Sequence, residues 1–332
     1  MPTSTSTTVT GVTPGTSASV TLTESDPGPA PMVVGTTVTA ADFGHLLPGR
    51  RDHGSRFCRT FSSPGDQIVD WANPRRRLPP GVADFHSFKD WPSDSVVVQW
   101  LTRQLDTMPA SLLAGPPLLP ELTVTDPDGY APDTTTYDGL SVLLCWKHEG
   151  EPDCIAADIP IREWRRRHQL AYRTVRQHPN GRRVGYIPIQ TGTWTEAKSA
   201  KGKAKGDWDP LSWWPGAGDY AGYDAYNLSD TTGEGAAGMY RDPVEFLTVP
   251  ALLAAGSGRR LFLPELGVVR QGDPPEDGTH RAVWIRAVVA ALRRVGAAGV
   301  AWWDAMGTGG RDFRLEDEPS RLAWREALAV PA

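Results

Sequence analysis

Residues 141–151 read Ser-Val-Leu-Leu-Cys-Trp-Lys-His-Glu-Gly-Glu, and the apolar first half of this stretch stops at a polar Lys-His-Glu. A short apolar run bounded in this way is typical of a buried strand in a parallel sheet. Residues 260–267 repeat the design, with an apolar run that ends at Glu265. In barrels of parallel strands, the chemistry takes place at the carboxyl ends of the strands. One glutamate after a strand is more often structural than catalytic, but two such strands predict that Glu149 and Glu265 share one two-carboxylate site.

Composition limits the classes of protein that this chain can belong to. It has 332 residues, 39% of them hydrophobic and 22% charged, which is enough for one large packed domain or two small ones. The net charge of −5 gives no general attraction to nucleic acid or to an anionic membrane. Three cysteines do not make a disulfide framework. No stretch approaches the ~18 consecutive apolar residues of a membrane span.

The rest of the chain predicts strands and helices in alternation. Predicted helices cover 93–108, 161–178, 243–255, 281–295 and 320–328, and residues 109–138 are Pro-rich with few periodic signals. Eight strands separated by helices or long connections are the pattern of an α/β protein of the (β/α)8 TIM-barrel class. The predicted strands are 32–38, 56–61, 82–89, 142–146, 183–190, 220–227, 260–265 and 299–304.

Two segments differ in composition from the barrel. Residues 1–30 are rich in Thr and Ser and are predicted to form a flexible or extended arm before a barrel domain at 31–332. They have neither a basic nor an apolar region of the kind found in classical signal peptides. The loop at 191–219 carries four lysines and then Trp213 and Trp214, and it is longer than ordinary connections. We expect its lysine half to be mobile and solvated and its tryptophan half to offer a stacking face to a sugar.

Four motifs in the expected order resemble those of family 26 β-mannanases, which are retaining glycoside hydrolases. His148-Glu149 matches the pair that closes the fourth strand of that family, and Glu265-Leu266-Gly267 matches its seventh-strand motif. Tyr223-Asp224-Ala225-Tyr226-Asn227 is similar to its sixth strand, and Trp302 or Trp303 is similar to the tryptophan that ends its eighth. The match spans most of 31–305. Gly150-Glu151-Pro152 departs from the Met-Asn-Gly usual after the His-Glu pair, which bears on the substrate more than on the reaction.

The resemblance implies a role for each of these residues. Glu149 would be the acid/base and Glu265 the nucleophile of a double displacement, in which one carboxyl protonates the leaving oxygen and the other attacks the anomeric carbon. Tyr226 would donate a hydrogen bond to Glu265, and Trp303 would form a sugar-stacking floor. His148 and His86 would contact the substrate. For Tyr226, Trp303 and His86 a purely structural role is equally compatible with the sequence.

The resemblance therefore implies an endo-acting hydrolase of a β-mannan-like or other β-linked cell-wall or surface polysaccharide. No metal and no cofactor are implied. Divergent members in actinobacteria and their phages are the nearer likeness. The substrate implies a place outside the cell or on a virion, with the arm as an assembly element, whereas the missing signal peptide is equally met by another export route or by an intracellular role. The alternative is a non-catalytic glycan-binding barrel, such as a phage tail or surface adhesin.

Other chemistries fit less well. His148-Glu149 is not a zinc-protease motif, because Pro152 occupies the position of the second histidine. The chain has no Gly-x-Ser-x-Gly elbow and no Walker loop. The lysines at 198–205 have no companion nucleic-acid-binding motif, so no nucleic-acid partner is expected.

Overall fold

The computed structural model describes the chain in segments. They are residues 93–106, 108, 142–147, 150–156, 158–191, 209–228, 240–270, 277–303 and 310–329. The backbone of further strands is described at 6–10, 17–21, 33–37, 60–61, 69–70, 73–77, 122–124 and 135–137.

The described barrel strands form two parallel sheets, β10-β9-β4 and β11-β12-β13-β14-β3, and neighbours within each are successive barrel strands. The last of them, β14, pairs with β3, the first, as a closed ring of strands requires. An open doubly wound sheet would instead reverse its strand order at a switch point. This closure confirms the predicted (β/α)8 barrel class. The strands run β3 (Val33–Thr37), β4 (Thr60–Phe61), β9 (Val142–Leu144), β10 (Val184–Tyr186), β11 (Ile189–Thr191), β12 (Ala221–Asn227), β13 (Leu261–Val268) and β14 (Gly299–Trp303).

Several strands differ in extent from the prediction. The predicted second strand, 56–61, is described only as β4, which pairs directly with β9. The predicted third strand, 82–89, lies outside the described residues.

The predicted fifth strand, 183–190, is two strands rather than one. The break falls at Pro188, which has no N–H to give to a strand ladder. Before the break, the Ile187 N–H donates to the Leu144 carbonyl oxygen at 3.0 Å, and after it the Pro188 carbonyl accepts from the Gly222 N–H at 3.2 Å. β10 therefore pairs with β9 and β11 with β12, so this one segment joins the two halves of the barrel.

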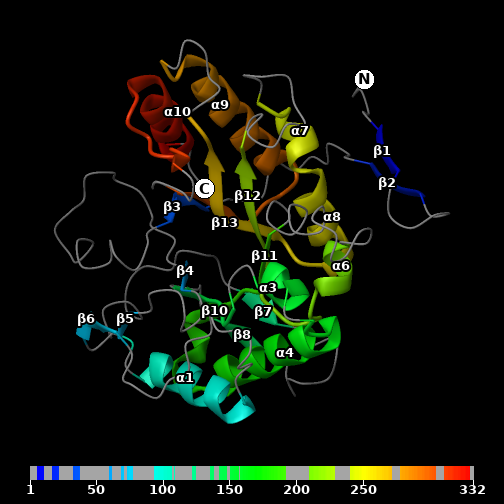
Figure 1. The fold of residues 1–332 in the computed structure, drawn as a ribbon, viewed down its shortest axis with the longest axis vertical. Coiled ribbons are helices and arrows are strands. Elements are labelled where there is room, and N and C mark those ends of the chain that lie inside the picture. Colours follow the sequence, from blue (N-terminus) through cyan, green and yellow to red (C-terminus); the bar gives the residue numbers. More distant parts are fainter. Residues whose placement is uncertain are drawn as a thin grey trace.

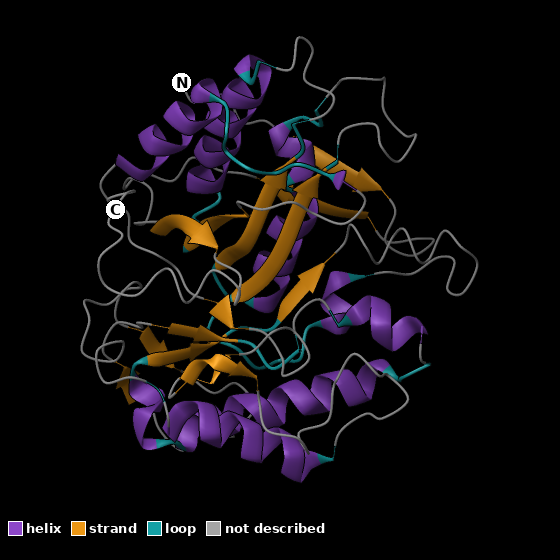
Figure 2. Cartoon of the chain, turned by 60° about the vertical axis from the view of Figure 1, so that its left-hand side comes forward, coloured by secondary structure: helices purple, strands orange, loops and turns teal. Residues whose placement is uncertain are grey.

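Helices lie outside the strands (Figures 1 and 2). The two views place α1 beside α4 below β9 and β10, and α9 beside α10 next to β13. None of the described helices is both long enough and apolar enough to cross a membrane. The helices are α1 (Asp94–Asp106), α3 (Glu151–Ala156), α4 (Ile161–Gln177), η2 (Pro179–Arg182), α6 (Pro210–Trp213), α7 (Pro243–Phe246), α8 (Thr248–Ser257), α9 (Thr279–Arg294) and α10 (Glu318–Ala329).

Local sequence explains where these helices begin and end. Asp209 and Asp242 cap α6 and α7, and their carboxylates accept from the N–H groups of Leu211 (2.9 Å) and Val244 (2.8 Å). α8 ends at Gly258, whose φ of 65° is a left-handed conformation that suits glycine.

The helix predicted at 243–255 is divided into α7 and α8. Pro250 is the reason, because a continuous helix would need its missing N–H to bond to the carbonyl of Phe246. The structure breaks at Leu247, which places Pro250 in the first turn of α8, where no N–H is required.

Short hairpins occupy segments outside the barrel. β1 (Ser6–Thr10) pairs antiparallel with β2 (Ser17–Thr21) within the N-terminal arm. β7 (Leu122–Val124) pairs with β8 (Thr135–Tyr137) in the Pro-rich segment, for which the sequence made no clear prediction. A further pair is formed by β5 (Val69–Asp70) and β6 (Asn73–Arg77).

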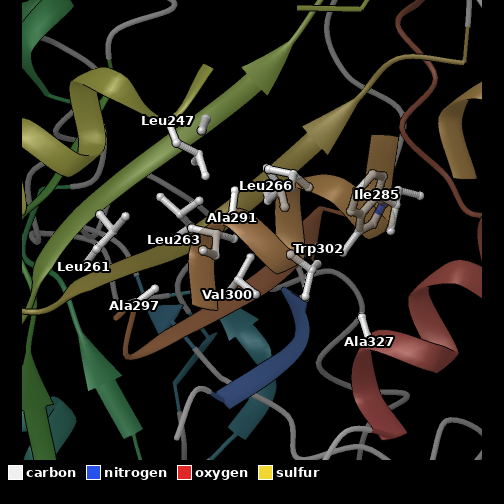
Figure 3. Packing of buried hydrophobic residues seen from close by; sticks show 14 of the residues in the cluster. Leu247, Leu261, Leu263, Leu266, Ile285, Ala291, Ala297, Val300, Trp302 and Ala327 are labelled. Carbon is white, nitrogen blue, oxygen red and sulfur yellow. The ribbon is translucent and has the colours of Figure 1, made fainter. Parts of the chain in front are cut away.

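A large apolar layer holds β12, β13 and β14 against α8, α9 and α10. Figure 3 shows Leu263 and Leu266 of β13 and Val300 and Trp302 of β14 on the side of the sheet that faces Ile285 of α9. These side chains are removed from water almost completely, and burial of each stabilises the fold by about 1.5–3 kcal/mol. The layer fixes which face of each strand points away from the barrel axis.

A buried arginine joins α9 to the segment before α10. Arg281 forms an ion pair with Asp317 and donates to the Ser320 hydroxyl at 2.9 Å and to the Arg314 carbonyl at 2.7 Å. Its side chain is fully buried, so these partners replace the water that the guanidinium loses on folding.

Candidate active site

The strands β12, β13 and β14 present polar and aromatic side chains on the face opposite the helices. Side chains alternate along a strand, and Tyr223 and Ala225 belong to the helix-facing layer. Asp224 and Tyr226 therefore point toward the barrel axis. The same alternation turns Trp303 inward, because its neighbour Trp302 faces the helices.

The sequence predicted that Glu265 ends its strand, but the structure places it at a β-bulge inside β13. Between Leu263 and Leu266, β13 advances three residues while β14 advances two, from Val300 to Trp302. The register with β12 shifts at the same place. Pro264 contributes to the irregularity because it cannot donate to the ladder. A bulge redirects a side chain, and here it lets Leu263 and Leu266 both face the helices while Glu265 faces inward.

Tyr226 and Glu265 meet across β12 and β13. The Tyr226 hydroxyl donates a hydrogen bond to Glu265 Oε2, as the sequence predicted. Glu265 is 6% exposed and Tyr226 is 8% exposed, so the pair lies largely out of bulk water. A hydrogen bond to a carboxylate in such surroundings stabilises the charged form of the acid, which is the form that a nucleophile needs.

An apolar cluster surrounds the ring of Tyr226. Leu228 and Val269, which follow β12 and β13, pack with Phe313, and the half-buried Trp303 packs against this group. These residues stand at the carboxyl ends of the strands, where barrel enzymes bind their substrates. Trp303, and not Trp302, is therefore the eighth-strand tryptophan that faces the site.

Sequence reasoning missed Phe313. Its ring lies 5.1 Å from the ring of Tyr226, centroid to centroid. The signal available was weak, since Phe313 is one aromatic residue between charged neighbours, in a segment to which no element was assigned.

Asp224 and Asn227, whose roles the sequence left open, have different surroundings. Asp224 is fully buried on the inner face, in register with Thr191 of β11. Asn227 points to the other face, where its amide exchanges hydrogen bonds of 3.4 and 3.5 Å with the backbone of Arg241. Asp224 thus lies on the same face of β12 as Tyr226, whereas Asn227 holds the segment that leads into α7.

Glu149, His148 and His86 lie outside the described residues, so their predicted roles remain predictions. Their described neighbours Lys147 and Gly150 are buried. β9 ends at Leu144, two residues earlier than predicted, and α3 begins at Glu151. In the sequence, Glu149 stands between these two elements.

A buried aromatic layer supports this end of β9. His168 of α4 lies against Trp146, with ring centroids 5.3 Å apart, and its Nδ1 lies 2.6 Å from the Tyr186 hydroxyl. Burial lowers the pKa of His168 to about 3 and raises the pKa of Tyr186 well above its usual value. The imidazole is therefore neutral at physiological pH and serves as a packing element.

Trp213 and Trp214 do not form the predicted stacking face. Trp213 is 3% exposed and packs edge-on against Trp164 of α4, with ring centroids 5.8 Å apart. Trp214 is 8% exposed and belongs to the helix-facing layer. Trp213 ends the short helix α6 and Trp214 follows it, and both side chains are buried in the outer core, so we correct their role from sugar binding to packing.

The described residues contain no group of three or more His, Cys, Asp or Glu that could hold a metal ion. The described half of the site offers a carboxylate, a phenol and aromatic surface. Such a set is able to carry out nucleophilic or acid–base chemistry on a polar substrate with an apolar face.

No protein-family model matches the chain, and no curated protein is similar to it in sequence. Solved structures give distant likenesses. A triple mutant of an endo-β-1,4-glucanase from Xanthomonas axonopodis pv. citri is 12% identical over 89% of this chain and 99% of its own, with a TM-score of 0.45. Two fungal β-1,4-galactanases are described in a structure that is 13% identical over 89% and 87%, with a TM-score of 0.47. A β-glucosidase from Pyrococcus furiosus is 12% identical over 83% and 66%, with a TM-score of 0.45. At these values the function has to be argued from the side chains.

Proposed function

We propose that this protein is a retaining glycoside hydrolase that cleaves β-linked polysaccharide. The observation that carries the proposal is the buried hydrogen bond from Tyr226 to Glu265 at the bulge of β13. The bulge turns one carboxylate into the mouth of the barrel, and the hydrogen bond from the phenol favours its charged form and orients it. Glu265 is the nucleophile in this proposal, and Glu149 is the acid/base.

The reaction would proceed by double displacement. Glu265 attacks the anomeric carbon while Glu149 protonates the departing oxygen, and water activated by Glu149 then releases the sugar. Trp303 offers an apolar face to the ring of the bound sugar. The substrate class remains the β-mannan-like or other β-linked polysaccharide that the sequence motifs imply.

Covalent trapping tests the nucleophile directly. A 2-deoxy-2-fluoro β-glycoside with a 2,4-dinitrophenyl leaving group should inactivate the protein and add one sugar to the peptide that contains Glu265. A panel of β-mannan, β-glucan, β-galactan and β-xylan with product analysis should identify the natural substrate. Glycan binding without turnover of any member, together with no trapping, would instead favour a non-catalytic glycan-binding barrel.

The acid/base has its own test. Glu149→Gln should slow hydrolysis of a natural polysaccharide much more than hydrolysis of a 2,4-dinitrophenyl glycoside, because a good leaving group needs little protonation. An experimental structure should place the two carboxyl groups about 5–5.5 Å apart, as retention requires. A separation of about 6.5–9.5 Å would indicate inversion and would contradict the proposed mechanism.

A further inference from the structure

The segment after β14 returns to the mouth of the barrel and is fixed there by its backbone. The Asp312 carbonyl accepts a hydrogen bond from the Arg270 N–H at 2.8 Å. The Phe313 carbonyl accepts one from the Trp302 indole Nε1–H at 2.9 Å. Two successive carbonyls are thus held by the residues that follow or belong to β13 and β14, so the position of Phe313 is set by the strands themselves.

The ring of Phe313 fills the space above a glycine of β13. A Cβ at Gly267 would lie 2.8 Å from Phe313 Cδ1, which is shorter than real contacts allow, and 3.0 Å from Tyr226 Cδ1, which is tighter than most of them. Phe313 is 2% exposed, and its ring is inclined by 56° to that of Tyr226. The absence of a side chain at Gly267 therefore lets the two rings pack together directly over the strand that carries Glu265.

This packing bears on the hydrogen bond at Glu265. A tyrosine ring held on one side only can swing about its side-chain torsions, and its hydroxyl then moves by the length of the ring. Phe313 and the Gly267 backbone bound the Tyr226 ring from two directions, while its hydroxyl donates to Glu265.

We propose that Phe313 is a positioning residue, which holds Tyr226 in the orientation that lets its hydroxyl order the Glu265 carboxylate. The inference rests on the proposed function, because it concerns the same nucleophile. Phe313 comes from outside the barrel strands and acts through Tyr226.

A matched control lies two residues further along the chain. Leu315 belongs to the same segment, but it packs against the helix-facing layer and not against the Tyr226 cluster. Loss of either side chain removes apolar packing. Only loss of Phe313 removes a ring that packs against Tyr226.

Kinetics on the full chain test the proposal with a 2,4-dinitrophenyl β-glycoside that the wild type hydrolyses. Phe313→Ala should lower kcat about tenfold to a hundredfold with little change in KM, because the misplaced group acts on the reacting centre. Phe313→Leu should recover most of the rate, and Leu315→Ala should leave kcat unchanged. The double variant of Tyr226→Phe and Phe313→Ala should be no slower than Tyr226→Phe alone, since both changes remove one interaction. Additive losses, or an unchanged kcat in Phe313→Ala, would overturn the proposal.

A second readout does not depend on turnover. With 3-fluorotyrosine at position 226, the ¹⁹F resonance reports the surroundings of the phenol. Glu265→Gln should shift it, Phe313→Ala and Gly267→Ala should also shift or broaden it, and Leu315→Ala should not. If Phe313→Ala fails to fold, Gly267→Ala displaces the same rings and decides the question. A wild type without any glycosidase activity would refute the proposed function, whereas an unmoved resonance in both ring variants would refute the positioning role alone.

Discussion

Tyr226 and Glu265 show how two residues 39 apart in the sequence become one chemical unit. Each lies on the inner face of its strand, but the unit forms only because the bulge adds a residue to β13 and redirects Glu265. The hydroxyl then supplies a charge-assisted hydrogen bond in a place from which water is largely excluded.

We predict that Tyr226→Phe lowers kcat/KM about tenfold to a hundredfold. The change removes one hydrogen bond to a charged group, which contributes about 1.5–3 kcal/mol, and preserves the ring. Steady-state kinetics on the 2,4-dinitrophenyl β-glycoside that the wild type hydrolyses measure the loss. Full activity in the Phe variant would show that the phenol is only a packing element.

Trp213 and Trp303 are predicted to respond in opposite ways to truncation. Trp213→Ala should lower the free energy of unfolding by about 3–5 kcal/mol, because it empties a buried site next to Trp164. Trp303→Ala should cost less stability and weaken binding of an oligosaccharide by about 1 kcal/mol. Denaturant unfolding and isothermal titration separate the two effects. Weakened oligosaccharide binding by a well-folded Trp213→Ala protein would instead support sugar stacking by Trp213.

For individual elements, the sequence predicted helices well, because their signals are local. It predicted the bounds of strands poorly, because these depend on how neighbouring strands pair. The helix at α4 was predicted from a basic run that ends at Pro179, and the structure adds its buried face, on which Trp164, His168, Ala171 and Val175 recur at helical spacing. The extension of β13 beyond Glu265 was not predictable, because a bulge is a relation between strands. The breaks at Pro188 and Pro250 could have been foreseen, since each proline lacks the N–H that an unbroken element needs.

Two ion pairs link α9 to α10 or to the residue before it, and they differ in burial: Arg281 with Asp317, and Arg286 with Glu326. Arg281→Ala should destabilise the protein by about 3–5 kcal/mol, because it leaves Asp317 without its buried partner. Arg286→Ala removes the pair with Glu326, which is about half exposed and screened by water, and should change the stability very little. Chemical denaturation of both variants gives the difference. Equal losses would mean that burial does not control the strength of the two pairs.

For the molecule as a whole, the barrel class was predictable, because it depends on the number of strands and on their order along the chain. Strand-like runs and helix-like runs alternate along the chain, and parallel strands joined by crossovers close in sequence order. The inner and outer faces were harder to assign. Strands buried on both sides show no alternation of polar and apolar residues, so the pattern offered no physical reason for choosing Trp303 over Trp302 as the inward-facing residue.

The stability of the whole molecule should fall as the pH is lowered below about 6.5. His168 has a pKa of about 3 in the folded protein, below its ordinary 6.5, because it is buried among aromatic rings. The unfolded chain therefore binds one proton more than the folded chain between these values. Stability from this residue is complete above pH 6.5 and is lost on acidification at about 1.4 kcal/mol per pH unit.

His168→Asn is the variant that isolates this titration. Its amide oxygen is able to take the place of Nδ1 beside the Tyr186 hydroxyl, but it does not titrate. The variant should be less stable at pH 7.5 and should lose less stability than the wild type between pH 6.5 and pH 5. Urea unfolding at a series of pH values measures both slopes. Glu163 does not interfere between pH 6.5 and pH 5. The hydrogen bond from Arg166 lowers the pKa of its carboxyl from about 4.5 to about 2, so it titrates below this range. Parallel slopes in the two proteins would show that His168 takes up its proton without unfolding the barrel.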